Sequence, residues 1–236
     1  MALLGDPLFG FLDLNQCGEA VGDGERFGES LVISLLYFAL SRGRLERISF
    51  MALKATIYKA NLQVADLDRG YYGDFDLTIA RHPSETDERL LIRLLAFALN
   101  VPKNNDQGAL EFAKDMWEPD EPGLWQKDLT GQLQQWIEIG QPDEKRLMKA
   151  SSRSRSVSVY SFSSSTPIWW NGIATKLTRA RNLTVIQVPP GPSQSLAALA
   201  QRAMRLQVTV QDGSIYMGDD QRSIEVSLHR LLDAKE

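Results

Sequence analysis

The stretch LWQKDLTGQLQQWIEIGQPDEKRLMKASSRSRSVSVYSF, Leu124–Phe162, decides the fold. It holds two runs of strand-forming residues separated by a turn pair, then a proline suited to the first turn of a helix, then a third apolar run. We assign a strand at Leu124–Leu129, a turn at Thr130-Gly131, a strand at Gln132–Ile139, a helix from Pro142 to about Arg153 and a strand at Val157–Phe162.

The residues before this stretch predict a hairpin and a helix. Alternating apolar and polar side chains are typical of half-buried strands, and a Ser-x-x-Asp pattern is a helix-capping signature. We assign strands at Lys54–Val64 and Tyr72–Ala80 around a turn at Asp68–Gly70, a cap from Ser84 to Asp87, a helix to about Leu99 and a short strand near Leu110–Ala113.

The residues after it predict alternating helices and strands, then an all-strand end. Asp212-Gly213 between two apolar runs is a strong hairpin signal. We assign helices at Thr166–Arg181 and Ser193–Met204, a strand at Leu183–Val188 and a last strand carrying Ile224, Val226 and Leu228. The whole pattern predicts an α/β fold, a mixed β-sheet with flanking helices.

Composition limits the function. The net charge of the 236 residues is −4, so nucleic-acid binding would need a local basic patch. One cysteine, Cys17, and two histidines, His82 and His229, leave carboxylates as the metal ligands, which favours magnesium or manganese. The apolar run Leu31–Leu40 is shorter than the roughly 20 residues that span a bilayer. We therefore expect a cytoplasmic protein without a membrane span.

Residues 1–50 differ in pattern from the rest. They are rich in glycine and acids, then apolar, then basic, and the regular domain pattern begins abruptly at Met51. We therefore expect an N-terminal extension over residues 1–50, from a start site placed too far upstream, and one domain over residues 51–236. The alternative is a genuine accessory helix around Glu29–Ser41.

Three acids are candidates for metal-dependent chemistry. Glu88 shares a helical face with apolar residues, Asp128 ends one strand, and Glu138 lies in the next with Trp136 on the face opposite the aliphatic side chains. A buried acid is costly unless it is paired, and acids on neighbouring strands can share a divalent cation. In the other interpretation, Glu88 is an acid stabilised by the helix dipole in the first turn, and Glu138 faces water or pairs with an arginine.

A basic stripe follows Glu138 directly. Lys145, Lys149 and Arg153 recur every four residues along the predicted helix, and Arg146 and Arg155 add charge. Such a stripe is commonly a solvated face. Its place after the Glu138 strand also suits contact with the phosphates of a nucleic acid.

Together these segments resemble the YaeQ family. The resemblance rests on MALKATIYKA, ADLDR, TIARHPSETDER, WIEIGQPDE, LMKAS, IWW, VTVQDG and IEVSL, in order over roughly residues 51–228. It implies a restriction-endonuclease-like fold of the PD-(D/E)XK superfamily, in which a helix, three strands, a helix and a strand carry the site.

The resemblance also implies roles for residues. The metal-binding acids would be Glu88, Asp128 and Glu138, but the expected lysine position holds Gly140, so Lys127 or Lys149 would have to supply the ammonium group. The leading hypothesis is a magnesium-dependent nuclease acting on DNA or RNA. The alternative is a non-catalytic nucleic-acid-binding or transcription-associated regulatory protein on the same fold. His82, beside the acids, is a further candidate.

Overall fold

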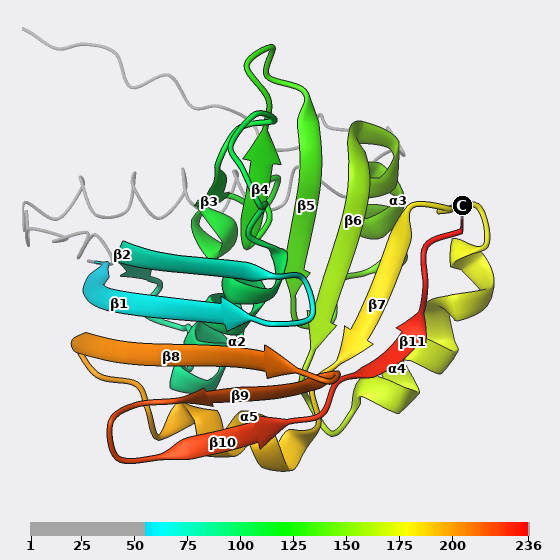
Figure 1. Cartoon of the computed structure of the whole chain (residues 1–236). Coiled ribbons are helices and arrows are strands. Elements are labelled where there is room, and N and C mark those ends of the chain that lie inside the picture. The colour runs from blue at the N-terminus through cyan, green and yellow to red at the C-terminus, as the bar shows by residue number, and fades with distance from the viewer. Residues whose placement is uncertain (1–54, 236) are drawn as a thin grey trace, which may run out of the picture. The chain divides into compact units, whose positions relative to one another are not determined.

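The computed structural model describes residues 55–235, which form two mixed β-sheets and four α-helices. Figure 1 shows one sheet lying across the other, with helices between and behind them. A single mixed sheet was expected, and this is wrong. The strands within residues 56–81 pair with those within residues 203–226 in a sheet of their own, and the last strand joins the other sheet.

The first sheet has five strands in the order β10-β9-β8-β1-β2. β1 lies parallel to β8 and antiparallel to β2. Its alternation is regular, since Ala60, Leu62 and Val64 are buried while Lys59 and Gln63 are exposed. The strands are β1 (Thr56–Asp66), β2 (Tyr71–Arg81), β8 (Ala203–Gln211), β9 (Ser214–Gly218) and β10 (Ser223–Val226).

The second sheet has six strands in the order β11-β7-β6-β5-β4-β3. β3, β4 and β5 form an antiparallel meander, and β6 and β7 continue parallel to β5. The strands are β3 (Leu110–Phe112), β4 (Leu124–Lys127), β5 (Leu133–Ile139), β6 (Ser154–Ser161), β7 (Leu183–Gln187) and β11 (His229–Leu232).

The helix α2 (Asp87–Asn100) belongs to the core between the sheets. Its residues from Leu90 to Ala98 are all buried, as expected for a helix covered on every side. It packs beside α5 (Pro190–Ala197), and their apolar side chains join the inner faces of both sheets in one cluster.

The outer face of the six-stranded sheet is covered by α3 (Glu144–Arg153), α4 (Thr166–Ile173) and the 3₁₀ turn η2 (Ala174–Leu177). Trp136, Val157 and Leu183 of the sheet pack against Leu147 of α3 in this second cluster. A further 3₁₀ turn, η1 (Asp115–Trp117), lies between β3 and β4.

Several predicted boundaries need correction. Thr86, not Ser84, caps α2, because its side chain accepts a hydrogen bond from the Arg89 backbone. The predicted helix at Ser193–Met204 begins and ends earlier. The predicted last strand ends at Val226, before Leu228, and a further strand, β11, follows in the other sheet. The predicted start at Met51 and the alternative helix at Glu29–Ser41 lie outside the described residues.

Within residues 55–235, no helix is both long enough and apolar enough to cross a membrane.

Candidate nucleic-acid interface and its neighbouring carboxylates

Glu138 lies near the C-terminal end of β5, on the face that turns toward α3. The alternation predicted for this strand is confirmed, since Trp136 packs with α3 while Ile137 and Ile139 join the inner core. Trp136 Nε1 donates to Glu138 Oε1 at 2.7 Å. Arg146, in the first turn of α3, donates from Nε to the same oxygen at 2.7 Å and from Nη2 to Oε2 at 3.1 Å.

The loop before β4 contacts Arg146 and Lys149 of α3. Arg146 donates through Nη2 to the Glu121 carbonyl at 2.7 Å and through Nη1 to the Pro119 carbonyl. One helical turn further on, Lys149 Nζ lies 2.5 Å from Asp120 Oδ1. Two cations of α3 therefore pair with acids at neighbouring strand ends. Arg146 pairs with Glu138 near the end of β5, and Lys149 pairs with Asp120 before the start of β4.

Burial and ion pairing shift the pKa values of Glu138 and Asp120 in opposite directions. Burial raises the pKa of Glu138, and Arg146 and Trp136 only partly offset that increase. The hydrogen bond from Lys149 lowers the pKa of exposed Asp120.

Asp128 lies in the turn at the other end of the hairpin. Its Oδ1 accepts hydrogen bonds from the Thr130 hydroxyl and from the backbone of Thr130 and Gln132, and these bonds lower its pKa. The Asp128 amide bonds the Gln132 carbonyl, six residues before Glu138 in the chain. At about 3.3 Å per residue, the two carboxylates are roughly 20 Å apart along the strand.

Glu88 is engaged elsewhere. It accepts a hydrogen bond at 2.5 Å from the hydroxyl of Ser193, a fully buried residue of α5. The predicted convergence of Glu88, Asp128 and Glu138 is therefore wrong, because each carboxylate has a separate set of partners. Among residues 55–235, no three His, Cys, Asp or Glu side chains gather as metal ligands.

A buried ion network, which we call the α2 quartet, lies beside Glu138. Glu85 and Asp115 accept from Arg89 and Arg93, and Asp115 also faces Glu138 closely enough to raise its pKa. Burial lowers the pKa of Arg93, against the effect of Glu85 and Asp115. Sequence reasoning missed these residues.

The structure also locates the candidate residues Lys127, Lys149 and His82. Lys127 lies opposite Leu133, at the far end of the hairpin from Glu138, with its ammonium 3.2 Å from the centre of the Trp125 ring. His82 packs edge-on against Trp117, with ring centres 4.5 Å apart. Only Lys149, of the two candidate lysines, belongs to the helix that contacts Glu138.

Exposed cations gather on and beyond α3. Asn182 brings the segment before β7 against the end of α3, because its side-chain amide donates to the carbonyls of Ser151, Ser154 and Arg155. We call this set the α3 basic surface: Lys145, Lys149, Arg153, Arg155, Arg179, Arg181 and Lys235. Of these seven cations, only Lys149 forms an ion pair within residues 55–235.

Arg146 does not belong to this surface. It was predicted with Lys145, Lys149 and Arg153 as a phosphate contact, but its donors are directed to Glu138 and the loop before β4. Arg179 and Arg181 were not predicted. They lie far from Arg153 in the sequence, and the pairing of β6 with β7 and the contacts of Asn182 bring them close.

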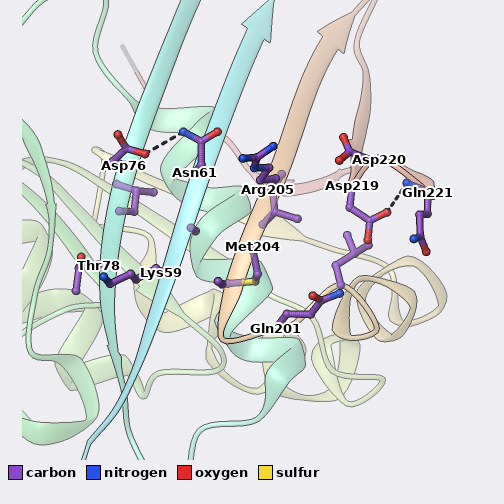
Figure 2. A pocket seen from close by; sticks show the side chains of 15 residues that line it. Lys59, Asn61, Asp76, Thr78, Gln201, Met204, Arg205, Asp219, Asp220 and Gln221 are labelled. Atoms are coloured by element: carbon purple, nitrogen blue, oxygen red, sulfur yellow. Dashed lines mark hydrogen bonds between the residues drawn. The ribbon is translucent and has the colours of Figure 1, made fainter.

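A groove of about 660 Å³ lies elsewhere, on the five-stranded sheet. Figure 2 shows Asn61 between Asp76 and Arg205, Lys59 beside Thr78, and Asp219 on the other side of Arg205. Its walls carry charges of both signs, and the Asn61 amide donates to Asp76 at 2.9 Å. This groove therefore presents no uniform field for a polyanion.

The carboxylates beside α3 do not fit a magnesium ion as they stand. Both oxygens of Glu138 accept from Arg146, and Asp120 is bound by Lys149. A divalent cation would have to compete with cations already in contact with its ligands.

The fold and the α3 basic surface define a mixed α/β protein with a cation-rich outer helix. Comparison with known proteins identifies its family. The model of the family described as YaeQ protein matches residues 51–228. The chain is 42% identical to the YaeQ protein of Escherichia coli (strain K12) and 41% identical to that of Salmonella typhi, covering 75% of this chain and 96% of each relative. The chain belongs to the YaeQ family.

Solved structures agree with this assignment. The crystal structure of the YaeQ protein from Xanthomonas axonopodis pv. citri matches with a TM-score of 0.71 and 45% identity, over 75% of this chain and 98% of that one. The YaeQ protein from Pseudomonas syringae matches with a TM-score of 0.70 and 36% identity, over 76% and 97%.

Proposed function

We propose that this protein binds nucleic acid without cleaving it, and that the phosphates lie on the α3 basic surface. One observation carries the proposal. The surface presents seven exposed cations, and only Lys149 is paired with an acid within residues 55–235. Glu144, the acid of the first turn of α3, is itself occupied by Lys176 at 3.1 Å.

The arrangement suits a phosphate backbone. Lys145, Lys149 and Arg153 follow one another at intervals of four residues, which places them along one side of a helix about 15 Å long. Arg155 follows the helix in β6, and Asn182, next to Arg181, donates to the Arg155 carbonyl. Because such contacts are electrostatic, they can operate in a protein whose overall charge is −4.

The paired carboxylates support binding over catalysis. A metal-dependent phosphodiesterase needs carboxylate oxygens open to the metal, whereas the Glu138 side chain is only 5% exposed and is bound by Arg146 and Trp136. The position two residues after Glu138 is Gly140, which supplies no ammonium group.

The test uses two triple variants with the same change in charge. Arg153, Arg155 and Arg181 become glutamine in the first, and Lys59, Arg205 and Arg222, exposed on the five-stranded sheet and its β9–β10 turn, become glutamine in the second. Binding to labelled single- and double-stranded DNA and RNA is measured over a range of salt concentrations. We expect the first variant to bind at least about tenfold more weakly, with a duplex salt slope smaller by up to about 2.7.

The control variant separates local contact from overall charge. We expect it to bind as the wild type does. Equal losses in the two variants would show that net charge alone governs binding, and no binding by the wild type at low salt would end the proposal.

Metal-dependent hydrolysis of DNA or RNA is a second candidate, favoured by the order of elements. α2, the antiparallel meander β3–β4–β5, α3 and the parallel strand β6 follow the restriction-endonuclease-like order. In this reading Asp120, on the loop before β4, replaces Asp128 as the partner of Glu138. Its test is incubation of each nucleic acid with magnesium, manganese or EDTA. Loss of substrate that requires the metal and disappears in Glu138→Ala would select it.

A further inference from the structure

Four oxygen atoms converge on the guanidinium of Arg146. Two are the carboxylate oxygens of Glu138, at 2.7 Å from Nε and 3.1 Å from Nη2. The other two are backbone carbonyl oxygens, those of Glu121, 2.7 Å from Nη2, and Pro119, bonded to Nη1. We call this set the Arg146 cage.

The composition of the cage is that of a hard-cation site. Calcium and related ions are bound by carboxylates together with backbone carbonyls, and water completes the shell. A guanidinium cannot accept hydrogen bonds, so every oxygen in the cage is aimed at positive charge. The Glu138 side chain is 5% exposed and that of Arg146 26% exposed, which leaves one side of the cage open to solvent.

We infer that the guanidinium of Arg146 takes the place of a divalent cation, so that the wild-type protein excludes metal here and loss of this side chain creates a metal site. Replacing arginine with a small residue leaves a buried carboxylate and two carbonyl oxygens without a cation. Such a cluster gains more from a bound metal than from water, because an unpaired buried charge is strongly unfavourable.

The surroundings support this exchange. Pro119 and Glu121 belong to the loop between η1 and β4, outside any strand, so their carbonyls are not committed to a β-ladder. Asp120 of the same loop, now on Lys149, is a further carboxylate within that segment.

Trp136 provides a direct readout. Its indole is hydrogen-bonded to Glu138 at 2.7 Å and is 4% exposed. A terbium ion, which binds in oxygen cages as calcium does, would lie within energy-transfer range of this ring. Excitation of tryptophan should then produce terbium luminescence when the cage is occupied.

The experiment compares wild type, Arg146→Ser, Lys149→Ala and the double variant Arg146→Ser/Glu138→Gln. Folding of each is checked by circular dichroism, and terbium is titrated with calcium and manganese as competitors. We expect Arg146→Ser to show saturable luminescence at least tenfold above the other three, and its melting temperature to rise when calcium is added. Lys149→Ala is the matched control, because it removes a cation of α3 that contacts no oxygen of the cage.

Two results would overturn the inference. One is a folded Arg146→Ser that gives no more luminescence than the double variant. The other needs no folded Arg146 variant: wild-type protein that binds terbium in a manner abolished by Glu138→Gln would show that metal displaces the arginine.

Discussion

The side chains of Arg89 and Asp115 form a doubly hydrogen-bonded ion pair. Nη1 donates to Oδ2 at 2.6 Å and Nη2 to Oδ1 at 2.9 Å. Nη2 also donates to the Ile139 carbonyl at 3.3 Å. Because Asp115 begins η1 and Ile139 ends β5, one guanidinium of α2 fixes the start of the loop that reaches Glu138. The α2 quartet thus positions the Arg146 cage.

Replacing Asp115 with asparagine should destabilise the protein strongly. Asp115 is 6% exposed, and the change leaves Arg89 and Arg93 sharing one carboxylate. Its backbone has a φ of 50°, which asparagine tolerates, so the effect is electrostatic. We expect a loss of about 3 kcal/mol in the free energy of unfolding, measured with urea.

Asp120→Asn is the control for that experiment. Asp120 is an exposed partner of Lys149, and such pairs contribute little. We expect its urea midpoint to match the wild type. If Asp115→Asn also leaves the midpoint unchanged, the α2 quartet does not hold η1 in place.

The two acids of β5 and its turn should respond to pH in opposite directions. Burial raises the folded-state pKa of Glu138, so its contribution to stability is complete below the ordinary value of 4.5 and is lost as the pH rises through the folded pKa. Wild type should therefore gain stability relative to Glu138→Gln as the pH falls from neutral to about 4. Unfolding in urea across this range measures the difference.

Asp128 gives the opposite trend. Hydrogen bonds, first that from Thr130, lower its pKa, so its contribution is present above the ordinary value of 3.8 and is lost as the pH falls through the folded pKa. Wild type should lose its advantage over Asp128→Asn in acid. Trends in the same direction for the two variants would contradict one of the two assignments.

The turn between β8 and β9 requires glycine. Asp212 and Gly213 have φ of 52° and 77°, and a type I′ hairpin turn needs a positive φ at both positions. No atom lies within 4 Å of the position of an added Cβ at Gly213, so a substitution there tests backbone conformation alone. We expect Gly213→Val to cost about 1–2 kcal/mol in thermal unfolding.

Gly172 of α4 is the matched control. Its surroundings are equally open and its φ is not positive. Gly172→Ala should leave stability unchanged or raise it by up to about 1 kcal/mol, because alanine favours a helix. A Gly213→Val variant as stable as the wild type would mean that this turn adopts another conformation.

Local patterns predicted most elements but not their assembly. Alternation located β1 and β2, and the turn pair Asp212-Gly213 located the β8–β9 hairpin, because these signals lie within a few residues. The pairing of β1 with β8 joins residues more than a hundred positions apart and leaves no local signal. The expectation of one sheet failed for that reason.

The prediction that Asp128 lies beside Glu138 failed because of the geometry of the β4–β5 hairpin. Asp128 was chosen because it was expected to end its strand, yet it lies in the turn. In an antiparallel pair, the end of the second strand lies beside the start of the first. Leu124 pairs with Ile137, so the loop before β4, with Asp120 and Glu121, is what meets Glu138. The hairpin itself could have corrected the choice.

Asn182 should control nucleic-acid binding without carrying a charge. Its amide donates to the carbonyls of Ser151, Ser154 and Arg155 at 2.8 to 3.3 Å, and so holds the Arg179–Arg181 segment against the end of α3. Asn182→Ala removes these bonds and leaves the number of cations in the chain unchanged. If the proposed interface is correct, the variant should bind more weakly and with a shallower salt slope, since fewer cations reach the phosphates together. Asn61→Ala, on the five-stranded sheet, loses a hydrogen bond to Asp76 and should bind as the wild type does. Unchanged affinity and slope in Asn182→Ala would confine the interface to the stripe on α3.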